Sequence, residues 1–152
     1  MGRDILGSAQ TGTGKTASFT LPMIDILASG RAKARMPRSL ILAPTRELAA
    51  QVAESFEKFS ANHKMSMALL IGGVSFSDQD AALSKGVDVL IATPGRLLDH
   101  FERGKVLLQD VKILVIDEAD RMLDMGFIPD VERIVSYLPV MRQTLFFSAT
   151  LS

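Results

Sequence analysis

At positions 113–120 the sequence reads Ile113-Leu114-Val115-Ile116-Asp117-Glu118-Ala119-Asp120, an apolar run that ends directly in a group of carboxylates. A short apolar run without polar alternation is typical of a strand buried on both faces, as in a parallel sheet. Further runs of this kind are Leu40-Ile41-Leu42-Ala43, Ala68-Leu69-Leu70-Ile71, Val89-Leu90-Ile91-Ala92, Leu145-Phe146-Phe147 and the shorter Asp4-Ile5-Leu6. The sequence therefore predicts a parallel sheet with carboxylates at one edge.

Amphipathic segments lie between these runs. Residues 46–60 place Leu48, Val52, Phe56 and Phe59 at helical spacing, and residues 15–29 and 129–138 also have apolar residues at helical spacing. We expect the helix that follows the carboxylates Asp117–Asp120 to break at Asp124-Met125-Gly126-Phe127, with Gly126 as the breaker. Alternating strands and helices in a chain of 152 residues predict a single α/β doubly wound domain over residues 1–152.

Composition excludes several classes of protein. Hydrophobic residues make up 47% and charged residues 22%, and no apolar run approaches the roughly 20 residues of a membrane span. The absence of cysteine excludes disulfides and thiolate metal sites, which fits a cytoplasmic location. Lys and Arg number 17, and Asp and Glu number 17, so the net charge is zero. Any contact with nucleic acid must therefore come from local geometry or from another part of the protein.

A phosphate-binding loop is predicted after the first strand. The segment reads Ala9-Gln10-Thr11-Gly12-Thr13-Gly14-Lys15-Thr16 and matches G-x-x-x-x-G-K-[ST] except that Ala9 replaces the first glycine. Gly12 and Gly14 let backbone N–H groups face a polyphosphate, and the following helix directs its positive end at the same anion. Lys15 would neutralise phosphate charge, and the hydroxyl of Thr16 would bind Mg²⁺. The alternative is a glycine-rich turn that caps a helix.

The carboxylates after residue 116 fit the same chemistry. A carboxylate at the end of a buried strand is costly unless it is paired, and Mg²⁺ on a nucleotide is a suitable partner. Asp117 would hold the metal, and Glu118 would orient or deprotonate the attacking water. The alternative is an acidic helix start, which the helix dipole favours. Together with the predicted phosphate loop, these residues indicate a phosphoryl-transfer site.

These two motifs and four further segments, in this order, resemble the DEAD-box RNA helicases. The further segments are Pro44-Thr45-Arg46-Glu47-Leu48-Ala49, Gly72-Gly73, Thr93-Pro94-Gly95-Arg96 and Ser148-Ala149-Thr150. Ala9, which departs from the general phosphate-loop pattern, is the residue that this family usually has there. The resemblance implies a RecA-like P-loop NTPase fold, with helices on both faces of a parallel sheet. It also implies an ATP-dependent RNA helicase with ATP and Mg²⁺ as cofactors.

The resemblance assigns a role to each segment. Lys15, Asp117 and Glu118 would be catalytic, and residues 9–16 would bind the nucleotide. Asp120 together with Ser148, Ala149 and Thr150 would couple hydrolysis to strand separation. The backbone of RNA would be gripped by Pro44, Thr45, Arg46, Glu47, Gly72, Gly73, Thr93, Pro94, Gly95 and Arg96.

Physical chemistry supports the RNA assignment, because each of these segments follows an apolar strand and so lies near the carboxyl edge, where open α/β sheets bind ligands. Thr93-Pro94-Gly95 reads as an N-cap followed by proline at the first helical position, and such a terminus binds phosphate. The alternatives are that Thr45 and Thr93 only cap helices and that Arg96 pairs with Asp99 or Glu102. We expect His63 and His100 to lie on the surface or at helix ends.

The resemblance also implies parts that residues 1–152 do not contain. These are an upstream segment that recognises adenine and a second RecA-like domain that supplies arginine fingers. We therefore expect the intact protein to be an RNA-stimulated ATPase that unwinds short duplexes. Residues 1–152 alone should be a monomer, bind Mg-nucleotide weakly and hydrolyse it very slowly. The compact spacing between motifs looks bacterial. Competing hypotheses are an ATP-driven DNA translocase and a binding module without turnover.

Overall fold

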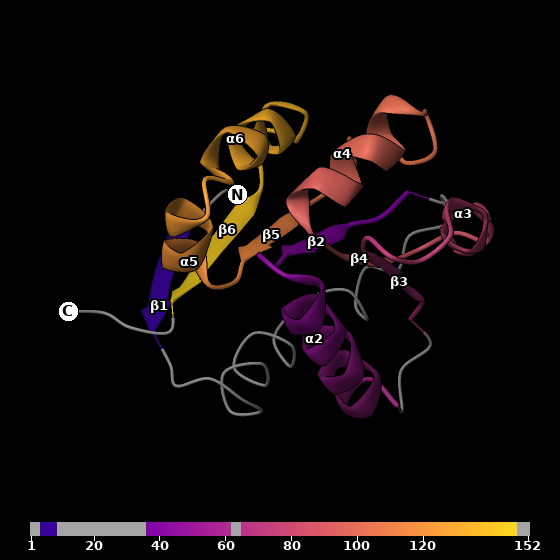
Figure 1. Cartoon of the computed structure of the whole chain (residues 1–152), viewed down its shortest axis with the longest axis horizontal. Helices are drawn as coiled ribbons and strands as arrows, with labels where there is room; N and C mark the ends of the chain where they lie inside the picture. The colour runs from indigo at the N-terminus through magenta and orange to yellow at the C-terminus, as the bar shows by residue number, and fades with distance from the viewer. Residues whose placement is uncertain (1–3, 9–35, 62–64, 149–152) are drawn as a thin grey trace.

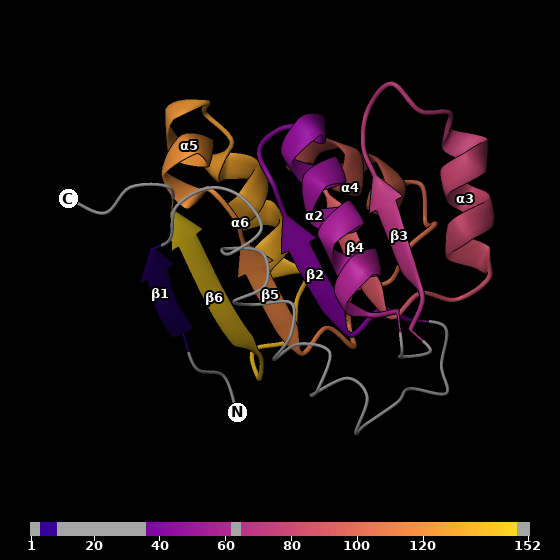
Figure 2. The same ribbon diagram turned by 90° about the horizontal axis from the view of Figure 1, so that it is seen from below.

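The fold is built on one parallel sheet, which the computed structural model shows in the residues that it describes, 4–8, 36–61 and 65–148 (Figure 1). The strands in sheet order are β1 (Asp4–Ser8), β6 (Gln143–Ser148), β5 (Ile113–Ile116), β2 (Ser39–Leu42), β4 (Val89–Ala92) and β3 (Met67–Leu70). Every neighbouring pair is parallel. Figure 2 shows this order across the sheet. The predicted strands are thus confirmed.

Helices cover both faces of this sheet. They are α2 (Arg46–Phe59), α3 (Phe76–Ser84), α4 (Pro94–Glu102), α5 (Ala119–Asp124) and α6 (Ile128–Ser136). In Figures 1 and 2, α2 lies on one face, α4 and α6 lie on the other, and α3 lies beyond β3. None of the helices among the described residues is long and apolar enough to cross a membrane. The α/β fold class is confirmed, whereas the helix expected at 15–29 lies outside the described residues.

Two hydrophobic cores explain the continuous apolar runs. In β2, Leu40 and Leu42 belong to the core beneath α4 and α6, whereas Ile41 and the following Ala43 belong to the core beneath α2. Successive strand residues point to opposite faces, so a strand that is covered on both faces buries all of its side chains. All four residues of β2, β4 and β5 are buried.

The residue after each central strand is held by the neighbouring strand. The N–H of Asp117 donates to the carbonyl of Leu42 at 2.9 Å, and the N–H of Thr93 donates to that of Leu70 at 3.2 Å. These bonds extend the sheet ladder by one residue into the loops. The first loop residues are therefore as firmly placed as the strands.

Candidate functional site

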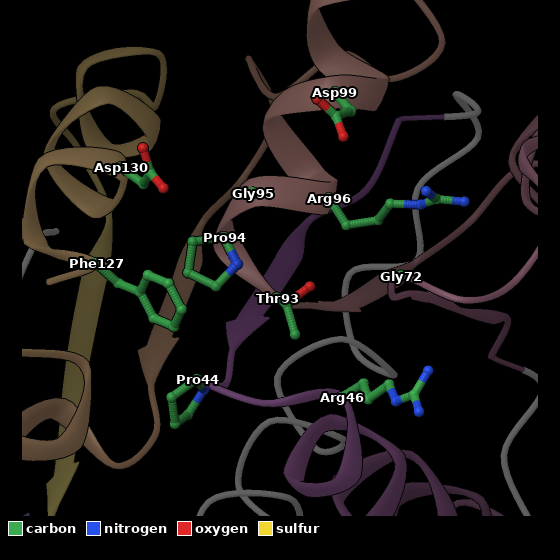
Figure 3. A pocket seen from close by; sticks show the side chains of 10 residues that line it. All are labelled: Pro44, Arg46, Gly72, Thr93, Pro94, Gly95, Arg96, Asp99, Phe127 and Asp130. Atoms are coloured by element: carbon green, nitrogen blue, oxygen red, sulfur yellow. The ribbon is translucent and has the colours of Figure 1, made fainter. Parts of the chain in front are cut away.

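A hollow of about 370 Å³ lies at the carboxyl edge of the sheet (Figure 3). It is lined by Pro44, Arg46, Gly72, Thr93, Pro94, Gly95, Arg96, Asp99, Phe127 and Asp130. The fold therefore brings together residues from all three of the segments that were predicted to grip RNA. Asp99, Phe127 and Asp130 also line the hollow, and no sequence motif pointed to them.

The two sides of the hollow differ in character. Figure 3 shows the side chains of Arg46 and Arg96 extending to the same side, with Gly72 between them. Pro44, Pro94 and Phe127 lie together on the opposite side. One side thus offers guanidinium groups, which bind phosphate with directed hydrogen bonds, and the other side offers an apolar wall.

The start of α2 places Arg46 in the hollow. Thr45 is the N-cap residue, and its Oγ1 accepts a hydrogen bond from the N–H of Leu48 at 3.1 Å. Thr45 therefore caps α2, and its predicted contact with RNA stays a prediction. Arg46 Nε lies 3.3 Å from Glu47 Oε2, with both side chains more than half exposed. Such an exposed pair contributes little to stability and leaves the guanidinium accessible.

The turn after β3 brings its backbone close to Arg46. Gly73 has φ +81°, a left-handed conformation that glycine adopts without cost. A β-carbon at this position would collide with Nη1 of Arg46. At Gly72, by contrast, a β-carbon would have nothing within 4 Å among the described atoms. Gly73 therefore has a conformational reason to be glycine, whereas a β-carbon there could be accommodated by a movement of the exposed Arg46 side chain.

The start of α4 differs from that of α2. Thr93 is the N-cap with extended backbone, and Pro94 occupies the first helical turn, as predicted. Within the described residues, however, the Thr93 side chain accepts no hydrogen bond that caps α4. Figure 3 shows this side chain in the middle of the hollow. Its hydroxyl is therefore placed to bind a ligand at the N-terminus of the helix.

Arg96 is held by residues that lie far from it in the sequence. Its Nε donates to Gln79 Oε1 at 2.9 Å, its Nη2 donates to the carbonyl of Val74, and its guanidinium lies 3.6 Å from the centre of the Phe76 ring. The alternative in which Arg96 pairs with Asp99 or Glu102 is therefore wrong. Glu102 pairs with Arg133 instead, and Asp99 lines the hollow.

His100 lies at a helix end, which was one of the two predicted positions, but it is buried and not on the surface. The residue is in the last turn of α4 but is 0% exposed, because α3 packs over it. Its Nε2 lies 2.6 Å from Gln79 Oε1, and its Nδ1 lies 3.4 Å from Asp80 Oδ1. Burial lowers the pKa of the imidazole below its usual 6.5. His63 lies outside the described residues.

The predicted catalytic carboxylates lie at the end of β5. Asp117 is 1% exposed and Glu118 is 5% exposed. Glu118 has φ 55° and ψ 49°, a left-handed conformation that costs a non-glycine residue roughly 1–2 kcal/mol. Glu118 stands at the N-cap position of α5, but in the described part of the chain its side chain does not cap the helix. Carboxylates do stand at the start of α5, with Asp120 in its first turn, so the acidic-helix-start alternative stays open beside the catalytic one.

The donor set suits the predicted metal. Mg²⁺ bound to a nucleotide takes one or two carboxylates from a protein, and Asp117, buried at the end of β5, would supply one. The described residues contain no group of three or more His, Cys, Asp or Glu that could hold a metal. The predicted nucleotide-binding residues 9–16, together with Ala149 and Thr150, lie outside the described residues. Ser148 ends β6, and its backbone pairs with that of Ser8.

The break after the carboxylates is confirmed. Helix α5 ends at Asp124, Gly126 follows with φ +78°, and α6 begins at Ile128. The N–H of Phe127 donates to the carbonyl of Met122 at 2.9 Å, which closes the turn. This turn places the Phe127 ring in the hollow beside Pro44 and Pro94 (Figure 3). A residue predicted to be part of a simple helix break thus contributes to the site.

Comparisons with known proteins agree on one family. The model described as "DEAD/DEAH box helicase" matches residues 1–152. The chain is 51% identical over 154 residues to the ATP-dependent RNA helicase DeaD of Buchnera aphidicola subsp. Schizaphis graminum, with 99% of this chain and 25% of the relative covered. It is 47% identical over 152 residues to the ATP-dependent rRNA helicase RRP3 of Pyricularia oryzae, with 99% and 28% covered. The chain thus spans about a quarter of the length of these relatives.

Solved structures give the same result. The yeast DEAD-box splicing factor Prp28 superimposes with a TM-score of 0.88 at 36% identity, covering 99% of this chain and 38% of that one. A DEAD box protein from Methanococcus jannaschii superimposes with a TM-score of 0.87 at 42% identity, covering 98% and 40%.

Proposed function

Because the chain belongs to the DEAD/DEAH box helicase family and has its RecA-like fold, we propose that it is the ATP-binding motor domain of an ATP-dependent RNA helicase. In this proposal it binds Mg-ATP and the backbone of single-stranded RNA. Hydrolysis of ATP then drives duplex unwinding together with a second RecA-like domain. The observation that carries the proposal is the convergence of Arg46, Gly72 and Thr93–Arg96 on one hollow at the carboxyl edge of the sheet.

The hollow supports RNA as the ligand despite the zero net charge of the chain. Arg46 and Arg96 offer cationic groups on one side, and the N-terminus of α4 and the Thr93 hydroxyl lie between the two sides (Figure 3). Phosphate binds well to such a combination. The wall made by Pro44, Pro94 and Phe127 suits the apolar faces of sugars or bases. Contacts of this kind hold a strand in place but do not read its sequence.

The carboxylates support the nucleotide site. In the proposal Asp117 binds Mg²⁺, and Glu118 orients the attacking water or accepts its proton. The left-handed backbone of Glu118 is consistent with such a role, because strain of this kind concentrates at functional sites. Lys15 and the phosphate loop would hold the phosphates, and Thr16 would share the metal. When bound, Mg²⁺ neutralises the charge that develops on the phosphates.

Strand order separates the two proposed sites on the sheet. The RNA segments follow β2, β4 and β3, which are adjacent, and the nucleotide and coupling segments follow β1, β6 and β5, which are also adjacent. The boundary is the β5–β2 pair, where the N–H of Asp117 is bonded to the carbonyl of Leu42. Residue 42 stands two positions before Pro44. We therefore propose that Asp117 and the RNA hollow are linked through this boundary, with Asp120 and residues 148–150 on the nucleotide side.

The proposal is tested by the ATPase activity of the full-length protein with matched single-stranded RNA and DNA. We expect turnover to be low without nucleic acid and to be stimulated by RNA far more than by DNA. Equal stimulation by DNA would instead support a DNA translocase. The absence of turnover under all conditions would support a binding module. Residues 1–152 alone should show very slow hydrolysis even with RNA.

A further inference from the structure

Helix α3 belongs to none of the motifs discussed so far, yet one of its residues bonds to one of the proposed RNA segments and to the residue that precedes another. Gln79 is 4% exposed. Its side-chain amide donates to the carbonyl of Ile71 at 2.8 Å, immediately before the Gly72-Gly73 turn. Its Oε1 accepts from Arg96 Nε at 2.9 Å. Gln79 therefore joins the end of β3 to the arginine on α4.

Chemistry fixes the orientation of this amide. A backbone carbonyl only accepts hydrogen bonds, and a guanidinium group only donates them. The Gln79 NH₂ group must therefore face Ile71, and its oxygen must face Arg96. The same oxygen lies 2.6 Å from Nε2 of the buried His100, so that nitrogen must carry the proton. A buried amide with a partner for each end is rigid, because every rotation would break a hydrogen bond.

Two further contacts confine Arg96. The ring of Phe76 lies under its guanidinium at 3.6 Å, and the carbonyl of Val74 accepts from its Nη2. Phe76 and Gln79 are both on α3, and Val74 is in the turn that leads into α3. The guanidinium is therefore fixed by residues that lie 17 to 22 positions before it. An ordinary exposed arginine samples many rotamers and loses this freedom when it binds.

We propose that Gln79 is a positioning residue of the RNA-binding hollow, which sets Arg96 and the Gly72-Gly73 turn in one fixed relation before RNA arrives. This inference rests on the proposed function, since it assumes that Arg96 binds the RNA backbone. Gln79 touches the two segments and not the RNA. Its effect on affinity is therefore exerted through the fraction of molecules in which Arg96 is in its binding position. If that fraction falls to about a tenth, the apparent Kd rises about tenfold.

The test uses the full-length protein and a fluorescein-labelled short polyuridine, whose binding is followed by fluorescence anisotropy over a range of salt concentrations. Gln79→Leu keeps the approximate volume but removes both hydrogen-bonding ends. Gln79→Glu keeps an acceptor for Arg96 and loses the donor to Ile71. Gln51→Leu makes the same chemical change at an exposed position of α2 and serves as the matched control. Arg96→Ala and the double variant Gln79→Leu/Arg96→Ala complete a double-mutant cycle, which measures the coupling between the two residues.

We expect Gln79→Leu to weaken RNA binding about tenfold, Gln79→Glu to restore most of the affinity and Gln51→Leu to have no effect. The slope of log affinity against log salt should be unchanged in Gln79→Leu, because a smaller binding-competent fraction lowers the affinity equally at every salt concentration, whereas Arg96→Ala should reduce the slope by about 0.7, the value for one phosphate contact on a single strand. The double variant should bind no more weakly than Arg96→Ala, because Gln79 acts through Arg96. The maximal ATP turnover of Gln79→Leu at saturating RNA should stay within about twofold of that of the unmodified protein, since only RNA binding is affected. Thermal unfolding of each variant verifies that it is folded.

The outcomes separate this inference from the proposed function. If Arg96→Ala weakens binding but Gln79→Leu does not, the positioning role is wrong and the proposed function stands. If the two substitutions have additive effects, Gln79 acts independently of Arg96 and the inference is also wrong. If Arg96→Ala itself leaves RNA affinity unchanged, the proposed RNA role of Arg96 fails first.

Discussion

The guanidinium of Arg46 occupies the space that a β-carbon at Gly73 would need. In its observed position, the arginine at the start of α2 lies against the turn after β3 at a point where residue 73 has no side chain. Arg46 can move aside, since its far end is flexible, but the backbone of residue 73 cannot escape its positive φ. The contact therefore links the stability of the turn to the position of a proposed RNA-binding group.

The first prediction follows from this contact. Gly73→Ala should lower the free energy of unfolding by about 1–2 kcal/mol, because alanine is strained at φ +81°. It should also weaken RNA binding by displacing Arg46. Gly72→Ala is the matched control for stability, since a β-carbon there meets nothing within 4 Å among the described atoms. Equal unfolding midpoints in urea for the two variants would contradict the prediction.

Two threonines at helix starts should respond differently to the same substitution. Thr45→Ala removes the hydrogen bond from Leu48 and should destabilise the protein by about 1 kcal/mol. Thr93→Ala should cost less than about 0.5 kcal/mol, because Thr93 makes no capping bond among the described residues. It should nevertheless weaken RNA binding. Urea unfolding and anisotropy measure the two effects, and a larger stability loss for Thr93→Ala would refute this assignment.

Arg46 should contribute to RNA affinity but little to the stability of the fold. Its ion pair with Glu47 is exposed, so Arg46→Ala should change the free energy of unfolding by less than about 0.5 kcal/mol. The substitution should reduce the slope of log affinity against log salt by about 0.7, the value for one phosphate contact on a single strand. Lys58→Ala, in the last turn of the same helix, is the charge-matched control. An unchanged slope for Arg46→Ala would place this residue outside the RNA contact.

His100 should make stability depend on pH near neutrality. Burial is the main cause that lowers its pKa below 6.5, while Asp80 and Asp99 raise the pKa and Arg96 and Arg103 lower it. The unfolded chain therefore takes up a proton at a higher pH than the native chain does. Between about pH 6.5 and the lower pKa of native His100, this residue binds a proton only in the unfolded chain. A fall in pH through this range therefore lowers the free energy of unfolding, and below the native pKa the loss is complete.

His100→Gln should remove this part of the pH dependence while keeping a polar group near Gln79. The urea midpoint of the unmodified protein should fall more between about pH 7.5 and pH 5.5 than the midpoint of the variant does. Parallel curves for the two proteins would show that His100 takes no part in the pH dependence.

Glu118→Gln should separate nucleotide binding from turnover. Loss of a general base lowers the rate by roughly 10²- to 10⁴-fold, while binding of Mg-ATP should remain, because the amide keeps the shape of the side chain. RNA-stimulated ATP hydrolysis and fluorescent-nucleotide binding by the full-length protein measure the two properties. Glu132→Gln, at an exposed position of α6, is the matched control. Retained turnover in Glu118→Gln would refute the proposed role.

The sequence predicts the strands well because burial on both faces leaves a clear signal. The apolar runs at 89–92 and 113–116 coincide with β4 and β5, and the helix expected at 46–60 appears as Arg46–Phe59. The sheet order was not predictable, because a single sequence records periodicity but not which strand pairs with which. The order β1-β6-β5-β2-β4-β3 depends on crossovers that no local pattern specifies.

The least predictable parts of the site are the contacts of Arg96 and His100. Local spacing suggested Asp99 or Glu102 for Arg96, but the actual partners Gln79 and Val74 lie on or before α3. A buried glutamine among small and polar residues has no distinctive pattern along the chain. Its burial arises from packing of α3 against α4. The one available signal was a polar residue on the same face of α3 as the buried Leu83.

The shared edge of the sheet has a mechanical consequence. The strands that precede the proposed nucleotide and RNA segments are joined by continuous ladders of backbone hydrogen bonds, and packed interiors are nearly incompressible. The ladders therefore resist a change in the separation between Asp117 and the hollow, and we expect this sheet to move as one unit. In the proposed helicase this domain would act as a rigid support and would not itself deform. The displacement that separates two RNA strands would come from another body that closes against this edge and opens again.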